Sequence, residues 1–96
     1  MSFSIQISFP QNKVAAYVNQ SVVADGLCDQ SGALIGWKLI NSEDEVIERG
    51  LAECDLGAFT IQLGNQWQNY CGETLIVQAA LGAQASSNIE IEANCQ

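Results

Sequence analysis

Four cysteines are the residues with the most distinctive chemistry in this chain: Cys28, Cys54, Cys71 and Cys95. No two of them have the C-x-x-C spacing of zinc sites and redox motifs, and an even number of cysteines in a chain of 96 residues is typical of disulfides. Disulfides persist in oxidising compartments, so we expect a secreted, periplasmic or cell-surface protein. A cytosolic protein with four reduced thiols would have the same sequence, and this alternative stays open.

The chain contains no histidine, which removes the commonest zinc ligand and the usual proton carrier near neutral pH. Catalytic triads and dyads built on imidazole are therefore excluded. A pair of carboxylates could still hydrolyse a glycoside, but the pair must flank a cleft, and a chain this short has little room for one. We expect no catalytic residues and no enzyme activity.

Carboxylates gather in the polar segment 41–48: Glu43, Asp44, Glu45 and Glu48. Because Ca²⁺ takes oxygen ligands, calcium is the one candidate cofactor, with Glu43, Asp44 and Glu45 as its ligands. Their spacing does not match the EF-hand loop, and a solvated turn that keeps the protein soluble is the alternative. A second acidic group could hold an ion between two loops: Asp25, Asp29 and Asp55.

Flat rings and amides share another polar segment: Gln66, Trp67, Gln68, Asn69 and Tyr70. Sugar-binding sites combine rings that stack on the sugar with polar groups that bond its hydroxyls. Trp67 and Tyr70 are therefore candidate stacking residues, and the three amides are candidate hydrogen-bond partners. The alternative is that Trp67 packs into the end of the hydrophobic core.

Three basic residues stand against 11 acidic ones, which gives a formal net charge of -8. This balance argues against binding to nucleic-acid phosphates or anionic lipid. No stretch approaches the roughly 18 consecutive apolar residues of a membrane span, so we expect no membrane insertion. The opening residues also lack the regions of a secretory signal, and a secreted form would have lost its signal.

Apolar residues recur at every second position in short runs separated by Gly, Asn, Asp and Ser, which is the pattern of β-strands. We expect an all-β chain and one domain over residues 1–96, with Trp37 in its core. A helix over 73–85 is the alternative for one segment, which is rich in Ala and Leu. The expected strands are 3–9 with a continuation near 13–18, 21–28, 34–40, 46–52, 58–63, 73–81 and 88–95.

Segments within 21–91 resemble bacterial immunoglobulin-like domains, including the Gmad2-type and fibronectin-like modules of secreted proteins. The resemblance is carried by "GWKLINSEDEVIERGLAECDLGAFTIQL" followed by "GETLIVQAALG". It implies a seven-strand immunoglobulin-like antiparallel β-sandwich. Such modules serve in adhesion, spacing or partner recognition.

The strand order of such a sandwich predicts the pairing of the cysteines. It places Cys28 and Cys54 at one end of the domain and the other two cysteines at the opposite end. Since a disulfide requires Cα atoms within about 7 Å, we expect the pairs Cys28–Cys54 and Cys71–Cys95. The same order places the acidic turn and the aromatic segment at one end.

These expectations favour a non-catalytic, secreted or cell-surface module that recognises a protein or glycan partner, as a monomer or a tandem module. The alternative is a small carbohydrate-binding module or lectin that uses Trp67 and Tyr70. A secreted inhibitor that inserts a loop into an enzyme cleft is a third class, supported only by a disulfide-braced end of the domain.

Overall fold

The computed structural model describes residues 7–83 and 85–95, and this part of the chain is built from strands and one short 3-10 helix. The prediction of an all-β chain is confirmed, and residues 74–81, for which a helix was the alternative, form a strand. The strands are β1 (Ile7–Ser8), β2 (Lys13–Tyr17), β3 (Val22–Cys28), β4 (Leu34–Ile40), β5 (Val46–Glu53), β6 (Ala58–Leu63), β7 (Thr74–Leu81) and β8 (Ala85–Asn94). The helix η1 (Gln66–Tyr70) connects β6 to β7.

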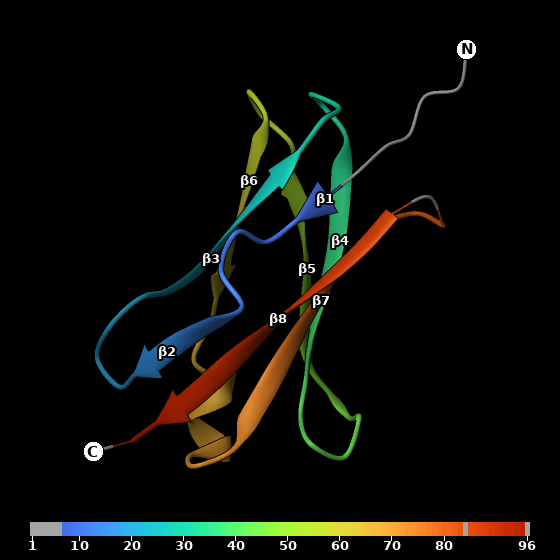
Figure 1. Ribbon diagram of the computed structural model, residues 1–96. Helices are drawn as coiled ribbons and strands as arrows, with labels where there is room; N and C mark the ends of the chain where they lie inside the picture. The colour runs from blue at the N-terminus through green and yellow to red at the C-terminus, as the bar shows by residue number, and fades with distance from the viewer. Residues whose placement is uncertain (1–6, 84, 96) are drawn as a thin grey trace.

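The strands form two sheets that pack against each other (Figure 1). One sheet has the order β1-β3-β6, and the other has the order β2-β8-β7-β4-β5. Alternate residues of each strand point inward, as in β6, where Phe59, Ile61 and Leu63 are buried and their neighbours are exposed. Inward side chains of both sheets join one hydrophobic core.

The first expected strand differs from the prediction. Of the expected strand 3–9, residues 3–6 lie outside the described part of the chain, and β1 pairs antiparallel with β3. Pro10, which has no N–H to donate to a ladder, follows β1. The chain then crosses to the other sheet, where β2 pairs parallel with β8. The described residues thus form eight strands with one parallel pair, and the expectation of seven purely antiparallel strands is wrong here.

Trp37 lies in the core with 8% of its surface exposed, as expected. Its ring covers Gly50, the cross-strand partner of Trp37 on β5. Phe59 covers Gly26 in the same way between β6 and β3. Each sheet therefore places a glycine where a large aromatic side chain of the neighbouring strand needs the space.

Both predicted disulfides are present. Cys28 ends β3 and Cys54 follows β5, so the first disulfide joins the two sheets, with Cα atoms 6.1 Å apart. Cys71 follows η1 and Cys95 follows β8, with Cα atoms 5.5 Å apart. Two disulfides in a small all-β domain are compatible with an extracellular location. Among the described residues, no helix is long and apolar enough to cross a membrane.

Candidate functional site

The predicted sugar-binding segment forms the helix η1, and its largest ring, that of Trp67, is buried. The Trp67 side chain is 1% exposed and belongs to the core. Tyr70 is partly buried against that core, and Gln66 and Asn69 are exposed. Because a ring that stacks on a sugar must present a face to solvent, Trp67 has the packing role that was the alternative.

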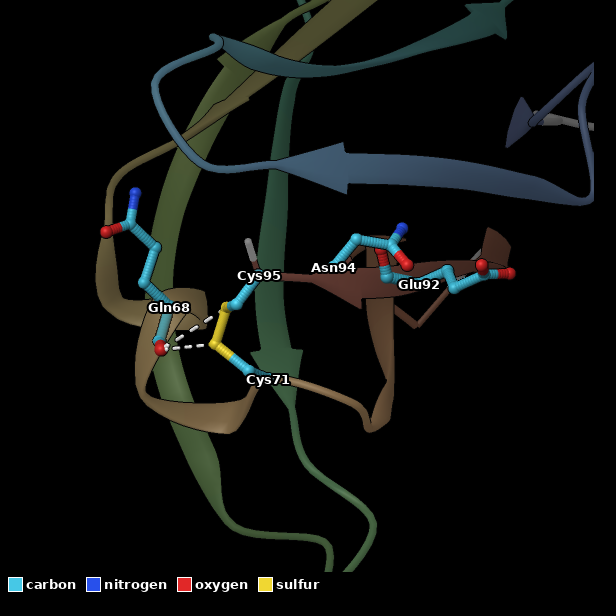
Figure 2. Close-up of a disulfide and its surroundings, with 5 residues drawn as sticks. All are labelled: Gln68, Cys71, Glu92, Asn94 and Cys95. Atoms are coloured by element: carbon cyan, nitrogen blue, oxygen red, sulfur yellow. Dashed lines mark hydrogen bonds between the residues drawn. A yellow bond between two sulfur atoms is a disulfide. The ribbon is translucent and has the colours of Figure 1, made fainter.

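The second disulfide fastens η1 to the end of β8 (Figure 2). The carbonyl oxygen of Gln68 lies 2.9 Å from Sγ of Cys71 and 3.9 Å from Sγ of Cys95. An oxidised sulfur carries no hydrogen, so these are close contacts rather than hydrogen bonds. In the same region, Nδ2 of Asn94 donates to the carbonyl oxygen of Glu92 at 3.2 Å. The segment is thus held mainly by burial and by the disulfide.

The acidic segment forms the turn between β4 and β5, and Asn41 organises it. Asn41 is 6% exposed, and its Oδ1 accepts the backbone N–H groups of Glu43 and Glu45 at 2.9 and 3.0 Å. Its Nδ2 donates to Oε1 of Glu45 at 3.1 Å. The side chains of Glu43, Asp44 and Glu45 are exposed. The turn therefore owes its shape to a side-chain amide.

The acidic turn and η1 lie at the same end of the domain (Figure 1). Oγ of Ser42 in the turn donates to Oε1 of Glu73, just after η1, at 2.9 Å. Glu48 does not join its acidic neighbours, because both of its carboxylate oxygens accept the N–H of Gly64, at 3.1 and 3.0 Å. This contact ties β5 to the residue that follows β6.

Across residues 7–83 and 85–95, no group of three or more His, Cys, Asp or Glu is placed to hold a metal ion. Asp25 of the second acidic group lies within β3, where Oγ1 of Thr60 donates to its Oδ1 at 3.2 Å. Asp29 and Asp55 lie outside the named strands, and each follows a cysteine of the Cys28–Cys54 disulfide. Calcium binding at the acidic turn stays a prediction.

An open groove of about 960 Å³ lies on the outer face of the five-stranded sheet. Its volume is at the upper end of the range of roughly 300–1,000 Å³ that ligand sites occupy. Outward residues of four adjacent strands line it, including Leu34 and Lys38 of β4, Arg49 and Leu51 of β5, and Ala80 of β7. Leu34 is 57% exposed and Leu51 is 70% exposed, so apolar surface is available at the groove.

Gly36 forms part of the groove floor, in the middle of β4. A Cβ atom at this position would lie 3.9 Å from Cδ2 of Leu51 and 4.0 Å from the carbonyl oxygen of Ala80, which is ordinary van der Waals contact. At Gly50, in contrast, a Cβ atom would lie only 2.7 Å from the Trp37 ring. Packing therefore requires glycine at position 50 and does not require it at position 36.

Two of the three basic residues of the chain lie in this groove. Lys38 and Arg49 are exposed and are direct cross-strand partners on β4 and β5. Gln78 and Asn88, which are partners on β7 and β8, add amide groups. The groove thus combines two cations, two amides and two exposed leucines over a floor of small residues.

This surface was not predicted from the sequence, because the candidate binding residues lie in the polar connections rather than on the outward faces of the strands. One local signal was present, since Gly36 is a glycine in the interior of a strand and stands between the apolar residues Ile35 and Trp37. The side-by-side order of β5, β4, β7 and β8 was also needed, and no local pattern gives that order.

No protein-family model matches the chain, and no curated protein matches it. The likeness to bacterial immunoglobulin-like domains therefore rests on the pattern of strands alone.

Proposed function

We propose that this protein is a non-catalytic, secreted or cell-surface recognition module with an immunoglobulin-like β-sandwich fold. Its partner is a protein that docks in the groove on the outer face of the five-stranded sheet. The two-sheet arrangement, the antiparallel pairing of β3 through β8 and the two disulfides support this fold and this compartment.

The observation that carries the proposal is the glycine at position 36. Glycine inside a strand weakens the strand, and it often marks a place where a ligand or another backbone approaches closely. No internal side chain occupies the space that Gly36 leaves, since the nearest atoms to an added Cβ lie at 3.9 and 4.0 Å. The space belongs to the groove, and we infer that Gly36 keeps it open for a partner.

The groove is held on a rigid frame. Its four strands are joined by antiparallel pairing, which shifts register between Leu39 and Ile40, with β4 between β5 and β7. One disulfide lies just after β5 and the other just after β8. A preformed surface loses little conformational entropy on binding, which favours recognition.

A small carbohydrate-binding module is the second candidate function. Gln66 and Asn69 expose their amides on η1, beside the partly exposed Tyr70. Titration with oligosaccharides, followed by tryptophan fluorescence, tests this candidate. A saturable change that is lost when Tyr70 is replaced by Ala supports it, and no response at millimolar sugar contradicts it.

The docking surface can be located before the natural partner is known. A library of random displayed peptides is selected against the oxidised protein, and the footprint of an enriched peptide is mapped by the NMR shifts of backbone amides. We expect the largest shifts at Gly36, Leu51 and Ala80. A footprint on η1, a footprint on the three-stranded sheet, or no enrichment would contradict the proposal.

A further inference from the structure

The distribution of charge in the groove is opposite to that of the chain as a whole. The chain carries 11 acidic residues and three basic ones. The residues that line the groove include Lys38 and Arg49 but neither Asp nor Glu. A positively charged depression on an acidic protein favours a ligand that carries negative charge where it enters the groove.

Among the residues that the structure describes, the two cations have no internal partner. Within residues 7–83 and 85–95, the one ion pair joins Lys13 to Glu92, with Nζ and Oε2 3.3 Å apart. Lys38 and Arg49 make no ion pair and no side-chain hydrogen bond with the described residues. They are instead direct cross-strand partners on the adjacent strands β4 and β5. Like charges in directly opposite positions destabilise a sheet. Folding alone does not account for this arrangement.

The net charge of the chain limits what kind of anion can bind. A nucleic acid, a sulfated polysaccharide or an anionic membrane would bring dense negative charge close to a protein of net charge -8. One or two carboxylates would meet the two cations without that repulsion. The exposed leucines at positions 34 and 51 also call for apolar groups on the ligand.

We propose that the groove binds a short acidic segment of a partner polypeptide, and this proposal rests on the function proposed above. One or two Asp or Glu side chains of the segment lie against Lys38 and Arg49, and a neighbouring apolar side chain lies against Leu34 and Leu51. Arg49 can hold a carboxylate through two parallel hydrogen bonds, whereas Lys38 acts as a point charge. The amides of Gln78 and Asn88 can bond the backbone of the segment.

The test uses peptides enriched by display on the oxidised wild-type protein. Their affinities are measured for the wild type, for the double variant Lys38→Gln with Arg49→Gln, and for Lys13→Gln. The Lys13→Gln variant is the matched control, because it removes a cation from the outer face of the same sheet but from outside the groove. Urea unfolding of each variant checks that the fold is kept.

We expect enriched peptides to contain Asp or Glu beside apolar residues. We also expect the double variant to weaken their binding about tenfold or more, because it removes two charge-assisted contacts, and Lys13→Gln to leave it unchanged. Binding should weaken with added salt. Enriched peptides without carboxylates, or equal affinity for the double variant, would overturn the inference.

A third variant separates this inference from the function on which it rests. Ala80→Phe places a large uncharged side chain in the groove from an outward, partly exposed position on β7. If Ala80→Phe blocks the peptides but the double variant does not, the groove is the docking surface and the acidic-segment inference is wrong. If neither blocks them, both proposals are wrong. Heparin or phosphatidylserine vesicles that bind the wild type, and not the double variant, would replace the acidic segment by a polyanion.

Discussion

The ring of Trp37 occupies the space above Gly50, its direct cross-strand partner in the five-stranded sheet. A Cβ atom at position 50 would lie 2.7 Å from Cζ2 of the ring, which is closer than real contacts allow. Gly50 and Gly36 stand on adjacent strands and serve different purposes. Gly50 makes room for the Trp37 ring in the core, whereas Gly36 leaves space in the groove on the outer face of the sheet.

Gly50→Ala should therefore lower the free energy of unfolding, by about 1–3 kcal/mol, because the Trp37 ring is held in a packed core and cannot easily move aside. Urea unfolding followed by tryptophan fluorescence measures this loss. Gly36→Ala is the matched control, and it should be neutral or stabilising by about 0.5–1 kcal/mol, since alanine orders a strand at lower entropic cost than glycine. Equal destabilisation by both substitutions would contradict the distinction.

The first disulfide should contribute a large part of the stability. It joins residues separated by 26 positions, and the loop-entropy model gives about 3 kcal/mol for a loop of this size. The double substitution Cys28→Ser with Cys54→Ser should lower the free energy of unfolding by about that amount, as measured in urea without reductant. Cys71→Ser with Cys95→Ser is the comparison, with a separation of 24 and a similar expected loss. No change in a variant would contradict a stabilising role for the corresponding bond.

Asn41 should be essential to the β4–β5 turn. Asn41→Ala removes the acceptor of two backbone N–H groups and should cost about 1–3 kcal/mol, measured by thermal or urea unfolding. Asn41→Asp keeps the accepting oxygen but places a second carboxylate against Glu45, so the comparison is made in a Glu45→Gln background, where Asn41→Asp should retain more of the stability than Asn41→Ala. If the two variants are equally destabilised, the accepted hydrogen bonds do not organise the turn.

Replacement of Leu56 should stabilise the protein. It lies in the two-residue turn between β5 and β6 with a φ of 53° and is 91% exposed. Asp55 and Ala58 exchange two backbone hydrogen bonds around this turn, at 2.8 and 3.1 Å. Turns of this kind favour Asn followed by Gly, so Leu56→Asn should raise the free energy of unfolding by about 1 kcal/mol.

Thermal unfolding measures this gain. The exposed strand residue Leu27 gives the control, because Leu27→Asn should destabilise the domain. A loss of stability in Leu56→Asn would show that the leucine side chain contributes contacts that its exposure does not suggest.

The sequence predicts the strands well where alternation is local. The expected strands 34–40 and 58–63 coincide with β4 and β6, because one face of each strand is buried and the period of two is clear. The parallel pairing of β2 with β8 could not be predicted, since a strand does not encode its partner locally. The disulfide pairs could be predicted from the expected strand order, because that order only has to place each cysteine at the correct end of the domain.

The candidate site was much harder to predict. Trp67 stands between two glutamines in the sequence, and only the fold shows that its ring enters the core. Lys38 and Arg49 are 11 positions apart in the sequence, and the register of β4 and β5 makes them neighbours. The groove therefore depends on the pairing of four strands, whereas the candidate site residues that the sequence predicts lie in the connections between strands.

The central claim is that Gly36 keeps the groove open for a partner at a cost to the strand. The affinity of Gly36→Val for a peptide selected on the wild type, measured by isothermal titration calorimetry, tests it most directly. We predict that the affinity falls about tenfold or more as valine fills the groove floor, a loss of about 1.4 kcal/mol. The free energy of unfolding should stay equal or rise, because β-branched residues favour strands. An unchanged affinity in a stably folded Gly36→Val protein would contradict the claim.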